Sequence, residues 1–417
     1  MSTPPSALPP ASPATPLPST VRTRVFVALA IASALLGSSV PSPLYPHYQE
    51  IWHLSSSFVS AVFATYAIGV LMALTLLGRI ADRIRDRRVI VLSGLGVIGL
   101  GSVIFAFATT PAWLLVGRLF AGAGTGAMVG AANAALVELD PRGDQQRAAV
   151  IGTMAFTAGG AFGPVLSGLA LQWDLWPTVL PFLAILATAV CAFIGIVASP
   201  WVHRPFVPPS QRTGAPPVSA RTLFTSLGFP FLIAMAALMM SWSVGSVFMA
   251  ASSTIATHLV GILNPALTGL LVFLFQAMGS VSQLAFRTVR FQTSITWGVL
   301  VVALAQVGFF LSAWAHSPVG FLIATAFAGL GYGAAFVGAA GLTNYIAPSA
   351  SRVTVVSWFY VAGYVGGNAL PALAVGVLAD AFGLFAAVGI FSAVVMAGGI
   401  YTLLRNRQLQ VAPTPAR

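Results

Sequence analysis

Charge is scarce in this sequence. Only 6% of the 417 residues are charged, and lysine is absent, so all 19 basic residues are arginine. A soluble domain has roughly a quarter of its residues charged. Because 58% of the residues are hydrophobic, we expect the chain to be embedded in a lipid bilayer. The net charge of +11 would suit nucleic-acid binding, but the arginines are dispersed between hydrophobic runs, so we predict no nucleic-acid partner.

Catalytic and metal-binding patterns are also lacking. The single cysteine, Cys191, stands in an apolar run, which excludes an internal disulfide and indicates a packing residue. No histidine or cysteine cluster has metal-site spacing. The eight acidic residues lie in loops or near the ends of hydrophobic runs, and HExxH, GxSxG and paired-aspartate patterns are missing from those runs. We therefore predict no metal, no cofactor and no enzymatic activity.

Long hydrophobic runs dominate what is present. A bilayer's hydrocarbon core of about 30 Å needs about 20 helical residues. The runs and the turn signals between them predict an all-α integral membrane protein with twelve transmembrane helices. The predicted spans are 25–45, 56–77, 89–109, 112–137, 148–171, 177–199, 224–250, 264–285, 294–314, 318–345, 353–378 and 383–404. We expect residues 1–21, rich in proline and serine, to be a disordered tail, and 406–417 to be a second tail.

Nearly all of the arginines lie on one side of the predicted spans. Eighteen of the 19 lie in the terminal segments or in loops on the same side. The opposite loops contain no arginine, but hold Glu50, Asp174, Asp380 and four of the five histidines. The positive-inside rule then places both termini in the cytoplasm and the protein in the inner or plasma membrane.

The sequence also repeats itself at an offset of 207 residues. The repeated pairs are AGAGTGA at Ala121 with AGLGYGA at Ala328, and Gly159-Gly160 and Pro164 with Gly366-Gly367 and Pro371. A proline-rich stretch, 201–221, lies between the copies and has the composition of a linker. We predict two pseudo-symmetric six-helix bundles, 22–200 and 222–405, joined by a cytoplasmic linker at 201–221.

Three motifs resemble those of one known family. GRIADRIRDRR, from Gly78 to Arg88, resembles the loop between helices 2 and 3 of the major facilitator superfamily of secondary transporters. Here Arg85 and Asp86 replace that family's glycine and first basic residue, and Arg87 and Arg88 are the substitutes for its basic pair. GRLFAGAGTG, containing Arg118, resembles the family's span 4 motif, whose arginine is associated with proton-coupled transport. AGGAFGPVLSG resembles the span 5 motif of its twelve-helix drug and metabolite antiporters.

The resemblance implies a transporter that works by alternating access. We predict proton-coupled export, by antiport, of a small neutral or anionic organic compound or drug, with the protein acting as a monomer. No carboxylate lies inside a span, and Arg118 is the one charge predicted there, which disfavours cations. Symport or facilitated uptake of a metabolite is the alternative, and a channel or receptor is a more remote one.

The candidate site residues form two sets. The predicted substrate and proton pathway comprises Arg118, Tyr66, Asn133, Trp242, Gln276, Tyr332, Tyr364 and Asn368. The predicted gating residues are Gly78, Asp82, Arg83, Arg87, Glu138, Arg147, Gly159, Gly163, Pro164 and Gly168.

Each set also has an alternative interpretation, in which the residues have no part in transport. Arg118 is expected to face an aqueous cavity or a polar partner, but it would reach the interface if it lay near a helix end. The charges around Glu138, Asp140, Asp144 and Arg147 are expected to close the inner side, or else are merely solvated. The span 5 glycines form a pivot or pack closely, and the remaining polar side chains line the pathway or join helices.

Overall fold

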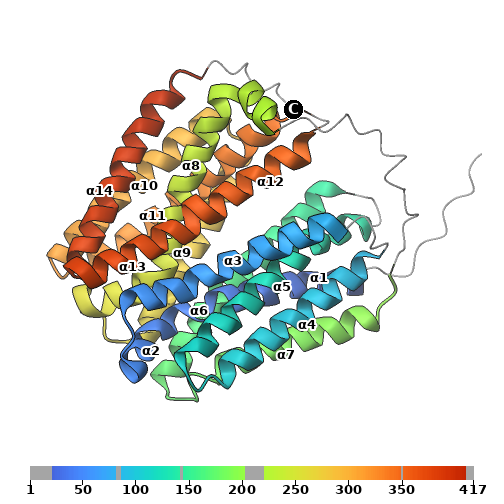
Figure 1. Cartoon of the computed structure of the whole chain (residues 1–417), viewed down its shortest axis with the longest axis horizontal. Helices are drawn as coiled ribbons and strands as arrows, with labels where there is room; N and C mark the ends of the chain where they lie inside the picture. Colours follow the sequence, from blue (N-terminus) through green and yellow to red (C-terminus); the bar gives the residue numbers. More distant parts are fainter. Residues whose placement is uncertain (1–20, 81–85, 141–143, 202–219, 349–350, 410–417) are drawn as a thin grey trace, which may run out of the picture.

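A computed structural model describes residues 21–80, 86–140, 144–201, 220–348 and 351–409. All regular structure in these ranges is helical (Figure 1). Twelve helical segments of the described chain are long and apolar enough to cross a membrane, which confirms the predicted fold class. The tail at 1–20, the tail at 410–417 and most of the predicted linker lie outside the described residues.

The predicted spans match the helices to within a few residues at most ends. The first six spans are α1 (Val21–Ser39) continued by η1 (Ser42–Leu44) and α2 (Tyr45–Trp52), α3 (Ser56–Ile80), α4 (Arg87–Ala106), α5 (Pro111–Glu138), α6 (Gln145–Gln172) and α7 (Leu180–Val197). The last six are α8 (Ala220–Ile255) with the π-helix η4 (Ala256–Val260), α9 (Pro265–Phe286), α10 (Phe291–Trp314), α11 (Pro318–Ile346), α12 (Arg352–Ala362) with the π-helix η6 (Gly363–Ala369) and α13 (Leu370–Phe382), and α14 (Leu384–Asn406).

Local chemistry sets many of these ends. Proline occupies the first helical position of α5, α9 and α11, where its missing N–H removes no helical hydrogen bond. Asp86 and Asp144 cap α4 and α6 by accepting hydrogen bonds from backbone N–H groups. The first span is broken rather than continuous because Pro41 and Pro43 cannot donate helical hydrogen bonds.

The two halves of the chain repeat the same helix contacts. We call α1–α7 the first half and α8–α14 the second half. A Cβ on Gly122 would meet the backbone of α3, and one on Gly329, 207 residues later, would meet the backbone of α9. Gly124 packs against α4 in the same way as Gly331 packs against α10. The small residues that the repeat preserves are therefore those that let neighbouring helices approach closely.

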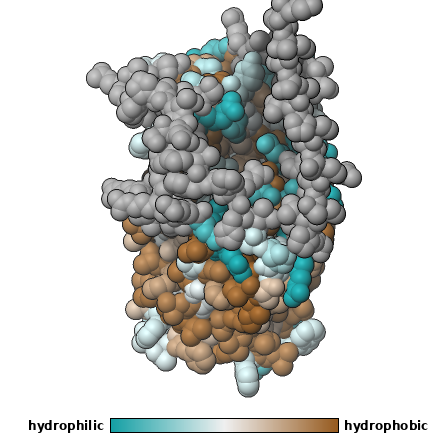
Figure 2. Space-filling model, turned by 90° about the vertical axis from the view of Figure 1, so that its right-hand side faces the viewer, coloured by the Kyte–Doolittle hydropathy of each residue, from teal (hydrophilic) through white to brown (hydrophobic). Residues whose placement is uncertain are grey.

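The halves lie side by side and touch mainly at one end. Contacts between them join α6 to α9 and α3 to α13, and the two groups of helices diverge toward the end where α1 begins and α14 ends (Figure 1). We call that end the terminal end, and the opposite one, where α2 ends and α3 begins, the distal end. Figure 2 looks onto the side of the molecule that is on the right in Figure 1, the terminal end, and shows hydrophilic residues in the middle and upper part of this face above a mostly apolar lower part.

Candidate functional site

A cavity of about 460 Å³ lies between the two halves. Residues of α1, α3, α5 and α6 line one wall, and residues of α8, α9, α11, α12 and η6 line the other. The lining runs from Ser38 and Met249 to Thr75 and Val356. The last two residues lie near the end of α3 and the start of α12, so the cavity extends toward the terminal end.

The lining is mostly apolar, with aliphatic and aromatic side chains and several polar ones, and carries no charged side chain among the described residues. Six of the eight predicted pathway residues line it, namely Tyr66, Trp242, Gln276, Tyr332, Tyr364 and Asn368. Sequence reasoning missed Tyr360, which also lines the cavity. Its position four residues before Tyr364 was the available signal, since residues at that spacing share a helix face.

Trp242 is the centre of an aromatic cluster on the second half. Its ring lies 5.0 Å from that of Tyr364 in an edge contact, 6.0 Å from Tyr360 and 6.1 Å from Phe336. Tyr364 also packs against Tyr66 of the first half. The π-helix η6 carries both Tyr364 and Asn368, and such segments are frequent at functional sites.

Arg118 lies outside the cavity lining. Its side chain is 1% exposed, and its Nη1 donates hydrogen bonds to the carbonyl oxygens of Gly37 at 3.3 Å and Ser38 at 2.8 Å. The guanidinium also stands 5.1 Å from the ring of Tyr66 and 5.5 Å from that of Phe63. Arg118 thus has polar partners at Nη1, whereas its Nε is buried with no hydrogen-bond partner among the described residues, and in this conformation the side chain is not at the surface.

Asn133 is the second predicted pathway residue that lies outside the lining. Its amide donates a hydrogen bond to the carbonyl of Val129 at 2.9 Å, one turn back on α5. A Cβ on Gly152 of α6 would collide with the Asn133 side chain. Asn133 therefore faces α6 within the first half but is exposed.

The glycines of α6 bring two different helices into close contact with it. Gly159 packs against the backbone of Ala32, and Gly163 packs against Ser39 and Val40, all in the first span. Gly168 faces the second half, where an added Cβ would lie 2.7 Å from the carbonyl oxygen of Pro265. This helix therefore binds its own half through one set of glycines and the other half through another.

Direct contacts between α6 and α9 extend from the middle of these helices to the distal end. Thr157 and Ser280 share a hydrogen bond of 2.8 Å, and Gly160 leaves room for the Gln276 amide. The carbonyl of Pro164 lies where a Cβ on Gly269 would stand. Side chains larger than glycine at these positions would hold the two halves apart.

A carboxylate joins the halves at the other side of the distal end. Asp380, in the last turns of α13, accepts hydrogen bonds from the backbone N–H groups of Ser56 at 2.7 Å and Ser57 at 2.8 Å. The next N–H, of Phe58, donates to the Ser55 hydroxyl. Three of the N–H groups that a helix start leaves free are therefore satisfied, two of them by the other half. Sequence reasoning placed Asp380 only in an outer loop and missed this contact.

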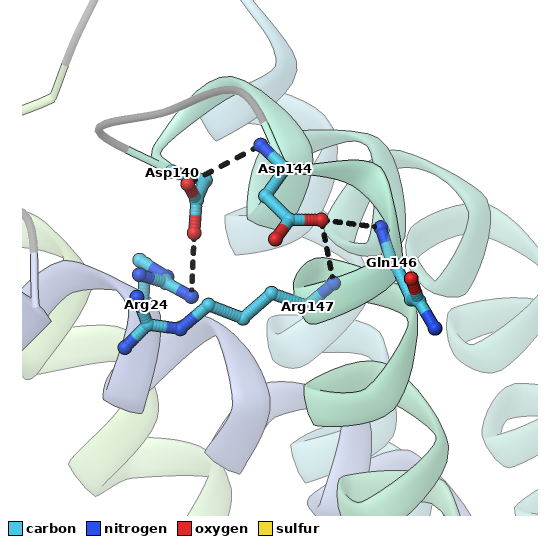
Figure 3. A network of polar contacts seen from close by, with 5 residues as sticks. All are labelled: Arg24, Asp140, Asp144, Gln146 and Arg147. Carbon is cyan, nitrogen blue, oxygen red and sulfur yellow. Dashed lines mark hydrogen bonds and ion pairs between the residues drawn. The ribbon is translucent and has the colours of Figure 1, made fainter.

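Ion pairs at the terminal end connect elements of the first half, and Figure 3 shows one of them, between Arg24 and Asp140. Arg24 of α1 pairs with Asp140 at 3.0 Å, and both side chains are almost fully buried. Arg87 of α4 pairs with Glu138 of α5 at 3.1 Å in a more exposed setting. Asp140 also accepts a hydrogen bond from the Asp144 N–H at 3.3 Å.

The remaining predicted gating residues make fewer side-chain contacts in the described structure. Asp144 accepts hydrogen bonds from the N–H groups of Gln146 and Arg147 (Figure 3), and the Arg147 side chain is exposed. Gly78 belongs to the last turns of α3, and Asp82 and Arg83 lie outside the described residues. In this conformation the described ion pairs of the cluster stay within one half.

The comparisons with known proteins agree on one family. The sequence model of the Major Facilitator Superfamily matches residues 27–371. The bacillibactin exporter of Bacillus subtilis is 28% identical over 145 residues, which are 33% of this chain and 36% of that protein. Multidrug resistance protein 2 of Bacillus subtilis is 26% identical over 161 residues, 39% of each chain. These matches span little more than a third of either relative.

Similarity to solved structures extends over the whole fold. A bacterial homologue of the human lysosomal transporter Spinster, solved in an inward-facing and unoccupied conformation, superposes with a TM-score of 0.76. The match covers 96% of this chain and 99% of that one at 15% sequence identity. At this identity the likeness establishes the fold.

Proposed function

Because the chain belongs to the Major Facilitator Superfamily, and is thus a multi-pass membrane transporter and not an enzyme, we propose that it exports a small organic compound by proton antiport. The compound is uncharged or anionic, and the two halves move by alternating access. The observation that carries this proposal is a cavity between two similarly built halves that extends toward the terminal end. At the distal end the halves are in direct contact.

Alternating access requires halves that can separate at one end while they close at the other. Here the cross-half contacts include close glycine contacts, the ring pair of Phe162 with Phe273 and hydrogen bonds such as Thr157 with Ser280 and Thr254 with Gln49. Such bonds contribute about 0.5–1.5 kcal/mol each. They are weak enough to be exchanged in a transport cycle, and we assign α6 with α9, and α3 with α13, as the moving seals.

The distribution of arginine supports an orientation with both termini in the cytoplasm. The cavity then extends toward the cytoplasm, which is the side from which an exporter takes up its cargo. Two further arguments favour export: relatives are named an exporter and a multidrug resistance protein, and α6 carries the antiporter-like glycine and proline pattern.

Proton coupling is the part of the proposal that most needs a direct test. Inside-out vesicles from cells producing the protein would be energised by respiration, and a pH-sensitive dye would report the proton gradient. Adding a transported compound is expected to dissipate part of the gradient, and an uncoupler should abolish accumulation of that compound.

The rival modes give different results when vesicles of both orientations are compared. A proton symporter that takes up a metabolite would accumulate its cargo in right-side-out vesicles instead. A facilitated carrier would only equalise concentrations and would ignore the uncoupler. A matched control is Gly168→Leu, whose side chain would strike the backbone of α9 and prevent the distal end from closing, and which should abolish all three modes.

A further inference from the structure

The charge of the cavity wall narrows the class of molecule that it can hold. None of its described lining residues is an acid, an arginine or a histidine. The Arg118 guanidinium stands behind the wall, beyond the ring of Tyr66 and bonded to the carbonyls of Gly37 and Ser38. Its positive charge repels a cation. It attracts an anion only through the wall, and because no ionised donor lines the cavity, an anion would lose its hydration without a direct charged hydrogen bond in exchange.

The shape of the wall favours a flat ring. Phe336, which is not a lining residue, stacks on Trp242 at an interplanar angle of 29°, and Tyr364 meets the same indole edge-on at 75°. These contacts hold the indole in place while it lines the cavity beside Tyr332 and Tyr360. Aromatic pairs gain from stacked or edge-on contact in addition to the area they bury.

Two polar atoms on this wall have no hydrogen-bond partner among the described residues. They are Nε1 of Trp242, a donor, and Oδ1 of Asn368, an acceptor. Both side chains line the same cavity, and Gly367, next to Asn368 in the chain, packs directly against Trp242. An unpaired buried polar group is unfavourable, and a molecule that offers one acceptor and one donor would satisfy both.

We propose that the cavity selects uncharged, flat aromatic molecules that carry a group with both a hydrogen-bond donor and an acceptor, and that their ring packs against Trp242. This inference rests on the proposed function, because it names the class of cargo for the same cavity. It takes the uncharged alternative of that proposal and excludes the anionic one.

The test compares naphthalene probes of one size that differ only in charge. They are 2-naphthamide, 2-naphthoate and (2-naphthyl)methylammonium, with the saturated decalin carboxamide as a test of flatness. Dissociation constants would be measured calorimetrically on the purified full-length protein. We expect 2-naphthamide to bind at least tenfold more tightly than the other three probes. Equal or tighter binding of the carboxylate, the ammonium or the saturated amide would overturn the inference.

Two variants connect the selectivity to the wall. Trp242→Leu is expected to weaken naphthamide binding about tenfold, whereas Trp297→Leu, at a side chain that is 54% exposed on α10, should leave it unchanged. Asn368→Leu should weaken 2-naphthamide but not its N,N-dimethyl derivative, which has no N–H to donate. A loss that is equal for both amides, or no loss for either variant, would contradict the proposed contacts.

Failure of this inference can be told apart from failure of the proposed function. The binding measurement is made at equilibrium, with no gradient and no membrane, so neither the direction of transport nor proton coupling affects it. If vesicles transport other compounds while no naphthalene probe binds, the cargo class is wrong and the exporter stands. If naphthamide binds selectively but no gradient drives any transport, the site stands and the proposed function falls.

Discussion

Removal of the Asp380 carboxylate should open the distal end of the protein. Asp380 caps the start of α3 from the opposite half, so its hydrogen bonds exist only while this end is closed. Loss of a helix N-cap costs about 0.5–2 kcal/mol, and loss of a negative charge at a helix N-terminus costs about 0.3–1 kcal/mol. Because water replaces the lost partner at this exposed position, we expect Asp380→Ala to disfavour the closed state by about 1.4 kcal/mol, which is tenfold in population.

A single reporter cysteine measures that shift. Cys191, the one native cysteine, would be replaced by alanine, and Ser60 by cysteine. Ser60 is 5% exposed and faces Gly376 across the two halves, so a membrane-impermeant maleimide reaches it only when the distal end opens. The labelling rate in intact cells or proteoliposomes should rise about tenfold in Asp380→Ala.

The control removes a different charge from the same end. Glu50→Ala, in α2, takes away an exposed carboxylate with no described bond to the second half, and its labelling rate should match that of the parent. If Asp380→Ala labels no faster than Glu50→Ala, the hydrogen bonds to Ser56 and Ser57 do not hold the distal end, and the reasoning is refuted.

Three further predictions concern stability and transport. Asp140→Asn leaves Arg24 buried without its ion pair and should lower the free energy of unfolding by about 3–5 kcal/mol. Glu138→Gln removes a more exposed pair and should lower it by under about 1 kcal/mol. Thermal unfolding in detergent measures both changes. Gly168→Ala, whose Cβ would stand 2.7 Å from a carbonyl oxygen of α9, should slow transport severalfold and speed distal labelling while leaving equilibrium ligand binding intact. Arg118→Met strips two backbone carbonyls of their donor and should cost about 1–3 kcal/mol for each unpaired group, which calorimetric or thermal melting would register.

Much of the architecture could be predicted because membrane helices are recognisable from the length and composition of their apolar runs. The hydrocarbon thickness fixes how long an apolar run must be, so each span was located without any knowledge of its neighbours. The 207-residue repeat was equally informative, because glycine is kept where two helix backbones touch. Gly122 and Gly329 make equivalent contacts with α3 and α9, and this equivalence follows from two sequence motifs alone.

The direction in which a side chain points was much harder to predict. A span that is apolar on every side has no polar face to indicate which residues meet a partner. Arg118 therefore could be assigned to a membrane helix but not to its position behind Tyr66. The pairs Arg24 with Asp140 and Asp380 with Ser56 join residues more than a hundred positions apart, and no local pattern relates them.

The placement of strong and weak contacts bears on how the molecule can move. The buried pair of Arg24 with Asp140 and the bonds from Arg118 to the α1 carbonyls all lie within the first half, where breaking them is costly. Across the halves, hydrogen bonds such as those of Asp380 form between short groups that water can also satisfy. Opening the distal end therefore costs a few such bonds, while the first half keeps its internal pairs throughout. A chain held together in this way favours rotation of whole bundles over rearrangement inside them.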